Sequence, residues 1–233
     1  MPERALTCQP YIGWEGTIIA VTLPNGSIVS IASGYGSVKT VTAITNANPG
    51  TASSTAHALT VGTYVEVTSG WSRLNSKIVR VINPLANAFD LEGVDTTLTA
   101  IYPAGSGVGS VRAVSGFTQL AQILTSNTSG GDQQFLTYQF LEADAQRQIP
   151  TFKNPQTVKF TVADDATLAG FQLAGVANDD RLPRAVKIVL ASGAIILYNA
   201  YVSLNRSPSL TINQLMECEV TLSLLNEPVR YIS

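Results

Sequence analysis

Charge is scarce in this sequence. Lys, Arg, Asp and Glu make up 13% of its 233 residues, about half of the ~25% that is usual in soluble domains. The formal net charge is −2 and no run of Lys or Arg occurs, which argues against a nucleic-acid-binding protein. Because interface cores are poor in Lys, Glu and Asp, so few charges are typical of a surface that partners cover. The weakly charged surface of a monomer explains the composition equally well.

Cysteine and long apolar runs are also scarce. Cys8 and Cys218 are the only cysteines, too few for a disulfide framework or a zinc site built from cysteines. We expect two free thiols in a reducing cytosol, with one bridge between them as the alternative. No stretch approaches the ~20 apolar residues of a membrane span, and the first residues lack the pattern of a signal peptide. We therefore expect a protein that folds in a cytoplasm and has no membrane partner.

Histidine occurs once, and this limits catalysis. A Ser-His-Asp or Cys-His arrangement would have to use His57, and no Gly-x-Ser-x-Gly motif lies near it. Glu217 and Glu219 point to one face of an expected strand. They could be the acid and base of a glycosidase, but an acidic stripe facing solvent or a lumen needs no catalytic assumption. No metal-ligand spacing occurs, and we predict a non-enzymatic protein without cofactor or metal.

Apolar residues alternate with polar ones along most of the chain, which is the pattern of half-buried strands. The alternation is clearest at residues 157–162, 185–190 and 216–224. Turn residues predict one hairpin at residues 24–26, after a strand at 18–23, and another at residues 192–193. The chain is therefore predicted to be mainly β.

One helix is expected at residues 166–177, with a loop as the alternative. Gly170 and Gly175 each lower helix propensity by ~1 kcal/mol, so we expect them where the helix lies close to a sheet. Asp164 or Asp165 is the expected N-cap, and Asn178 is the expected C-terminal stop. Leu168, Phe171 and Val176 lie roughly on one side of the expected helix.

Residues 38–114 have a composition of their own, with short expected strands between turn-rich stretches. Five or six short strands in such a segment predict a small all-β barrel. We interpret this segment as a domain inserted into a discontinuous β-sandwich made of residues 1–37 and 115–233, since exposed loops whose ends lie close together accept such insertions.

Residues 144–155 are predicted to form a long polar loop. A loop of this length in a compact domain is usually functional or ordered by a partner. The alternative is a surface excursion without a role. The candidate contact residues in this segment are Asp144, Arg147, Gln148, Phe152 and Lys153.

The C-terminal half contains the succession "VKFTVADDATLAGFQLAGVAND", "RAVKIVLASG", "AIILYNAYVSLNRSP" and "MECEVTLSLLNEPVRYI", with "SGGDQQFLTYQFLEADAQRQIPT" before it. In this succession of strands and turns it resembles the major tail tube protein of long, non-contractile-tailed bacteriophages. The resemblance covers residues 1–34 and 117–233, and its motifs are patterns of strand and turn rather than chemical residues. The segments "AHALTVGTYVEVTSGW", "LNSKIVRV" and "FDLEGVD" resemble small β-barrel decorations of phage tube proteins.

The resemblance implies a tail-tube-type β-sandwich or barrel with one short α-helix, which assembles into hexameric rings stacked as the tail tube of a virion. It implies a tape-measure protein, a tail terminator and distal tail or baseplate proteins as partners. Double-stranded DNA would pass through the lumen without specific binding. The candidates for the lumen-facing strand are Glu217, Glu219, Thr221 and Ser223, since acidic side chains would repel DNA.

A tail-associated binding module or adhesin that recognises a host surface or glycan is the alternative function. Its discriminating feature would be an aromatic or polar pocket in residues 38–114. Trp71 with Tyr64 is the only hint of such a pocket in the sequence.

Overall fold

A computed structural model describes residues 24–232 of the chain. The predictions for Cys8 and for the strand at 18–23 lie outside the described residues. The described part contains sixteen strands and one helix. They are β1 (Ile28–Tyr35), β2 (Lys39–Val41), β3 (Ala43–Ile44), β4 (Gly50–Ser53), β5 (Tyr64–Ser69), β6 (Lys77–Ile82), β7 (Ala88–Leu91), β8 (Gly109–Leu120), β9 (Ile123–Gly130), β10 (Gln133–Tyr138), β11 (Arg147–Lys153), β12 (Gln156–Ala163), α1 (Ala169–Asp180), β13 (Arg184–Val189), β14 (Ile195–Ser209), β15 (Glu217–Leu224) and β16 (Val229–Tyr231).

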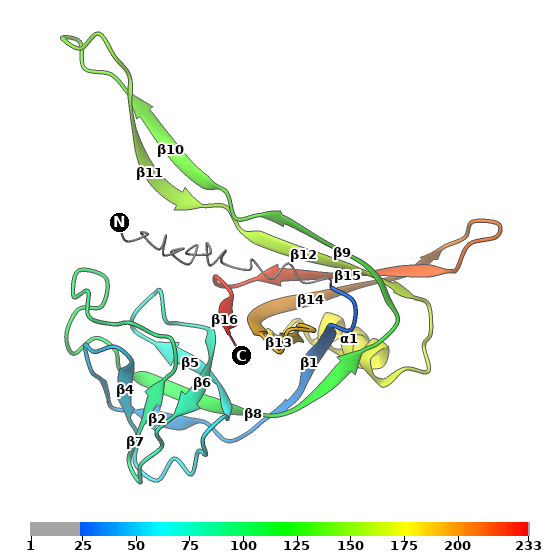
Figure 1. The fold of residues 1–233 in the computed structure, drawn as a ribbon, viewed down its shortest axis with the longest axis horizontal. Coiled ribbons are helices and arrows are strands. Elements are labelled where there is room, and N and C mark those ends of the chain that lie inside the picture. The colour runs from blue at the N-terminus through cyan, green and yellow to red at the C-terminus, as the bar shows by residue number, and fades with distance from the viewer. Residues whose placement is uncertain (1–23, 233) are drawn as a thin grey trace, which may run out of the picture.

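The main sheet is antiparallel and curls around one core, so the prediction of a mainly β fold is confirmed (Figure 1). Its strand order is β8-β1-β13-β14-β15-β12-β9, and β16 pairs with the first part of β14. The predicted alternation holds, because every second residue of β12 and β15 is buried in this core. These residues are Val158, Phe160, Val162, Cys218, Val220 and Leu222.

Helix α1 covers the open side of this core, with Ala174 and Ala177 fully buried against it. The helix begins three residues later than predicted and ends at Asp180, where Arg181 adopts a left-handed conformation (φ 55°). The expected Asn178 stop is therefore wrong. The expected aspartate cap is also wrong, because Asp165 accepts hydrogen bonds from the N–H and hydroxyl of Thr167 in a turn before the helix.

The two helix glycines lie close to strands, as predicted. A Cβ on Gly170 would lie 2.1 Å from the carbonyl oxygen of Gln119 in β8. A Cβ on Gly175 would lie 3.1 Å from Nη2 of Arg206 and 3.8 Å from the side chain of Leu204 in β14. Val176, expected on the same side as Leu168 and Phe171, is 55% exposed.

Residues 38–114, here called the insert, contain β2 to β7 and the first residues of β8. Strand β2 pairs with β8, and β3, directly after it, pairs with β4. The hydrogen-bonded series β8-β5-β6-β7-β4-β3 therefore returns to β8 through β2. The insert has its own core, in which Trp71, Phe89 and Leu91 are at most 1% exposed. That the insert folds as a separate domain stays a prediction.

Contacts between the insert and the main sheet involve both polar and aromatic groups. Asn199 of β14 donates to Glu66 Oε1 (2.9 Å) and to the carbonyl of Ser76 (2.9 Å). The Tyr231 hydroxyl accepts from the Arg80 N–H (2.8 Å) and donates to the Glu92 carbonyl (3.2 Å). Burial raises the pKa of Tyr231 to about 12. These contacts join segments that lie far apart in the sequence and fix the insert on the sheet.

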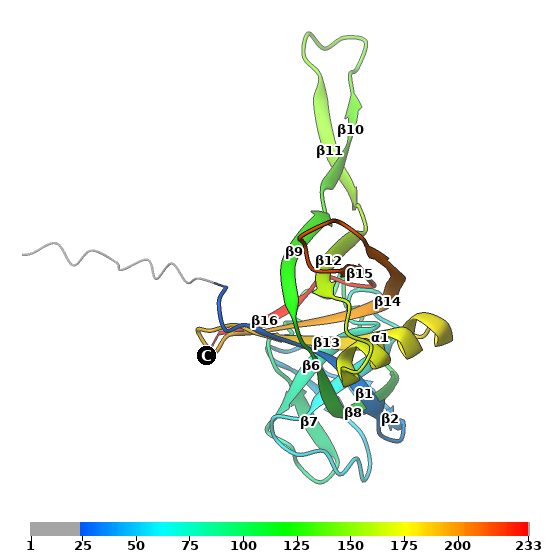
Figure 2. The same cartoon turned by 90° about the vertical axis from the view of Figure 1, so that its right-hand side faces the viewer.

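The predicted loop at residues 144–155 is wrong, because most of it is a strand. Strand β11 pairs with β10 to form a separate two-stranded hairpin, with Tyr138 opposite Arg147 and Leu136 opposite Ile149. Figures 1 and 2 show this hairpin and the insert projecting to opposite sides of the main sheet.

Candidate assembly surfaces

One side of β9, β12, β15 and the second half of β14 carries mostly uncharged polar residues; we call it the polar face. It is the side opposite to the buried residues of β12 and β15. The register places Thr161 beside Glu219, and Thr157 beside Ser223. All four candidates Glu217, Glu219, Thr221 and Ser223 lie on it, and β9 and β14 add Thr125, Asn127, Ser129, Ser203 and Asn205.

The charge of the polar face is partly neutralised. Lys159 Nζ lies 3.0 Å from Glu219 Oε1, and both side chains are 47% exposed. The hydrogen bond from Lys159 lowers the pKa of Glu219, and the Thr221 hydroxyl adds to this effect. Glu217 has no ion-pair partner among the described residues. The polar face is therefore only weakly acidic. It would repel an anion less strongly than two unpaired glutamates would.

The β10–β11 hairpin exposes large apolar side chains on both strands and at its tip. Phe152 is 65% exposed and Leu141, at the tip, is fully exposed. Phe135, Leu136, Phe140 and Ile149 are each about half exposed. Since a two-stranded hairpin alone is marginally stable in water, apolar side chains on a projecting hairpin indicate contact with another molecule.

The base of the hairpin is tied to the main sheet. Lys153 forms an ion pair with Glu227, which follows β15, and this ion pair lowers the pKa of Glu227. Gly130 and Gly131, both with φ near +80°, begin the hairpin on the other strand. A hollow of about 700 Å³ lies at this base, between residues 153–156 and 224–228.

The model of the family described as "Phage tail tube protein, TTP" matches residues 69–233. The chain belongs to the phage tail tube protein family. A search of curated proteins gives no match. Among solved structures, the cryo-EM structure of the anti-feeding prophage cap, which terminates that tube, matches with 15% sequence identity and a TM-score of 0.36. The match covers 49% of this chain and 83% of that chain.

Family membership makes this tail tube protein a structural component of the phage tail and implies self-assembly into a tube. The residues with possible chemistry fit a structural role. His57 is buried, accepts from the Leu59 N–H (3.0 Å) at Nδ1 and donates from Nε2 to the Leu85 carbonyl (2.7 Å). Trp71 is 1% exposed and bonds to the Pro103 carbonyl, so it cannot be the stacking surface of a glycan site.

The described residues contain no group of three or more His, Cys, Asp or Glu side chains that could hold a metal ion. Within residues 24–232, no helix has the length and apolarity that crossing a membrane requires. The Cys218 thiol is buried and free, and burial raises its pKa.

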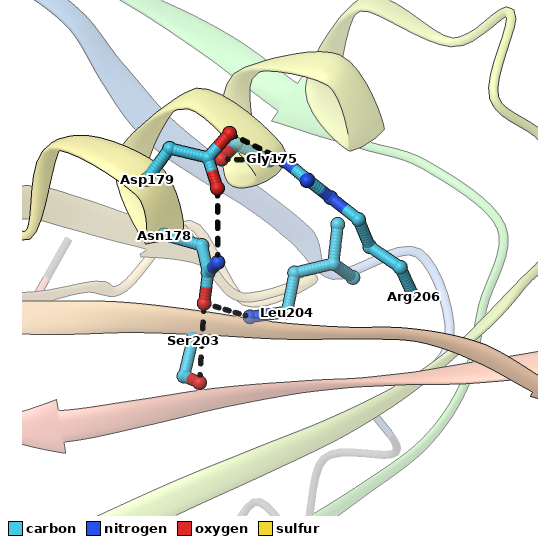
Figure 3. Close-up of polar contacts among 6 residues, drawn as sticks. All are labelled: Gly175, Asn178, Asp179, Ser203, Leu204 and Arg206. Carbon is cyan, nitrogen blue, oxygen red and sulfur yellow. Dashed lines mark hydrogen bonds and ion pairs between the residues drawn. The ribbon is translucent and has the colours of Figure 1, made fainter.

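The polar face of the tail tube protein lies between two strand edges. On one side β9 pairs only with β12, among the described strands. On the other side β14 runs on to Ser209, although its pairing with β13 ends at Ala200. Beyond the last paired residue, α1 covers this edge of β14 (Figure 3). Asn178 accepts from the Leu204 N–H at 3.2 Å, and Arg206 donates to Asp179 at 2.7 Å.

The predicted contact residues of the tail tube protein all lie on the hairpin. Arg147, Gln148, Phe152 and Lys153 are exposed on β11, and Asp144 is exposed at the tip. The apolar residues of β10 were not predicted as contact residues, and neither were Asn178 and Arg206 at the β14 edge. The aromatic and β-branched residues of "QQFLTY" were the available signal for β10. Nothing in the sequence indicates the contact between α1 and β14.

Proposed function

We propose that copies of this chain form hexameric rings that stack into the phage tail tube, through which the genome is delivered. The tube is built around a tape-measure protein and is completed by a tail terminator and by distal tail or baseplate proteins. Assembly takes place in the host cytoplasm. The hexamer and these partners come from the family resemblance; the surfaces described above support the proposal in the following ways.

The exposed apolar side chains of the β10–β11 hairpin are the main support for the proposed stacking of rings. The hairpin projects from the main sheet, and Phe135, Phe152 and Leu141 on it are at least half exposed. Burial of their remaining exposed area against a neighbouring ring would stabilise the stack by about 1–3 kcal/mol for each side chain, most for the fully exposed Leu141. Asp144, Arg147, Gln148 and Lys153 supply polar contacts around them.

The polar face is proposed to line the lumen. DNA is gripped by clusters of Lys and Arg, because these residues replace counterions on the phosphates. Lys159 is the one basic residue that the β9, β12 and β15 registers place on this face, and Glu219 pairs with it. Glu217 leaves a small excess of negative charge, so DNA would pass without being held.

The insert is proposed to lie on the outside of the tube. It packs on the half of the curled sheet formed by β1, β13 and the start of β14, away from β9 and β12. A lumen that admits DNA has no room for six copies of it.

Shortening the hairpin tests the stacking. Gly130 of β9 and Gln156 of β12 are directly paired, so an Asn-Gly turn can replace residues 131–155 without breaking that ladder. The shortened chain should form single rings or monomers in electron micrographs, while the unaltered chain forms tubes. Tubes of normal length and number from the shortened chain would refute the proposed role.

A point substitution refines the same test. Phe152→Ser removes one exposed apolar side chain from β11 and should raise the protein concentration needed for tube formation. Thr137→Ser on the facing strand keeps the hydroxyl and serves as the matched control. Equal critical concentrations for the two variants would show that the apolar surface of the hairpin is not used.

A further inference from the structure

The last turns of α1 cover the backbone of an unpaired strand edge. Asn178 Oδ1 lies 3.2 Å from the Leu204 nitrogen and 3.4 Å from the Ser203 hydroxyl (Figure 3). A side-chain carbonyl therefore accepts the hydrogen bond that a neighbouring strand would accept in a longer sheet. The last residue of β14 with a strand partner on this side is Ala200, opposite Arg184.

A second contact holds α1 on this edge. Arg206 Nη2 donates to the Gly175 carbonyl at 3.1 Å and to Asp179 Oδ2 at 2.7 Å. The arginine side chain is 56% exposed, so this ion pair contributes little to stability. The cover over the edge therefore consists of a few weak contacts from the last turns of one helix.

The opposite edge of the same half of the sheet has no such cover. Strand β9 consists of Ile, Leu, Thr, Ser, Asn and Gly, with no charge and no proline. Its second edge has no strand partner in the described part of the chain. Uncharged edges without proline are the ones that pair with other chains.

The family resemblance implies that strands of neighbouring subunits join into one continuous barrel round the lumen, which would place β9 of a second copy on the β14 edge from Val202 to Arg206. We infer that Asn178 and Arg206 keep this edge covered in the free subunit. This inference rests on the proposed tube and concerns how the joining of neighbouring subunits is controlled. Pairing β9 with β14 is head-to-tail, so each joint needs one edge of each kind. Covering β14 alone is therefore enough to slow the addition of one subunit to the next.

The exchange leaves no polar group without a partner. When β9 of the neighbour arrives, a backbone carbonyl replaces Asn178 as the acceptor for the Leu204 N–H. Asn178 is half-buried and Arg206 is exposed, so water can reach both side chains once they are released. Assembly thus replaces a few side-chain contacts by a strand ladder.

Hydrogen exchange on the free subunit tests the cover directly. In Asn178→Ala the Leu204 amide should exchange about fivefold faster or more, as expected for loss of one ordinary hydrogen bond. Gln172→Ala is the matched control, because Gln172 lies on the same helix and its side-chain amide donates to the Ala166 carbonyl, away from the β14 edge. An unchanged Leu204 exchange rate in Asn178→Ala would show that the cover does not exist in solution.

Assembly kinetics test whether the cover over the β14 edge slows the joining of subunits. The lag before light scattering rises should be shorter by about fivefold in Asn178→Ala and shorter in Arg206→Ala, with Gln172→Ala equal to the unaltered chain. If Asn178→Ala folds poorly, the lag of Arg206→Ala tests the inference instead, since the Arg206 side chain is more than half exposed and its loss should leave the fold intact. Equal lags in all four proteins, with normal tubes, would overturn the inference and leave the tube proposal standing.

Two further outcomes separate the inference from the proposal beneath it. If no variant forms rings or tubes, even with the tape-measure protein, the tube proposal itself fails. If tubes form but the β9 amides exchange as fast in tubes as in free subunits, β9 is not the partner strand and the inference is wrong. Protection of β9 and of Leu204 together in tubes is the expected result.

Discussion

Replacing Gly170 with alanine should destabilise the protein, whereas the same change at Gly175 should not. Both residues lie in α1, and in an exposed helix interior alanine gains about 1 kcal/mol over glycine. A Cβ on Gly170 would meet three backbone atoms of β8: the Gln119 oxygen at 2.1 Å, its carbon at 2.8 Å and the Leu120 Cα at 2.9 Å. None of these atoms can move without moving the strand.

The cost at Gly170 follows from this geometry. The helix has to shift away from β8, which loosens its contacts with the core around Ala174 and Ala177. Overpacking of this kind costs about 1–3 kcal/mol, and the propensity gain is small because Gly170 is the second residue of α1. We expect a net loss of about 2 kcal/mol.

Gly175 is the matched control. The atom closest to a new Cβ is the tip of the Arg206 side chain at 3.1 Å, which can move into solvent. We expect Gly175→Ala to be neutral or more stable by up to about 1 kcal/mol. Urea denaturation of the free subunit, followed by far-ultraviolet circular dichroism, measures both. A Gly170→Ala protein as stable as Gly175→Ala would refute the close packing of α1 on β8.

Three further predictions concern other parts of the molecule. Tyr231→Phe leaves the Arg80 N–H and the Glu92 carbonyl without their partner and should lower the unfolding free energy by about 1–3 kcal/mol; Tyr201→Phe is the control, and equal stabilities would contradict the contact. The raised pKa and burial of Cys218 predict slow alkylation at pH 8 in the native protein and fast alkylation in urea, read by peptide mass spectrometry; fast native labelling would argue against a closed core. The hydrogen bond from Lys159 lowers the pKa of Glu219 in the folded protein. This contact stabilises the fold above the ordinary glutamate pKa of about 4.3, and the stabilisation is lost as pH falls through the lower folded pKa. The Tm difference between the unaltered chain and Glu219→Gln should therefore shrink towards pH 3, and a constant difference would count against the Lys159 contact.

The alternation of apolar and polar residues was sufficient to predict strands β12, β13 and β15 of the main sheet, but not their order in it. Val158, Phe160 and Val162 are buried as the period of two requires. The same rule failed for β11, because both of its faces are exposed and no apolar side has to alternate. Pro150 within the strand also weakened the signal; the structure places it opposite Phe135 beside a register shift.

The covered edge could not be predicted because it depends on contacts across the fold. Asn178 and Leu204 are 26 residues apart, and their hydrogen bond exists only because the sheet brings β14 under the end of α1. Asp165 illustrates a local error of a different kind. Its carboxylate had two possible uses, a helix cap or a turn, and it bonds Thr167 in the turn.

The insert is synthesised before the residues that hold it on the main sheet. Glu66 bonds to Asn199, which lies 133 residues later in the sequence, and Arg80 bonds to Tyr231, which lies 151 residues later. During synthesis the insert leaves the ribosome well before the strands that receive it. A product whose translation stops early would carry the insert without the strands that hold it on the main sheet. Only chains translated through Tyr231 therefore present the complete subunit to a growing tail.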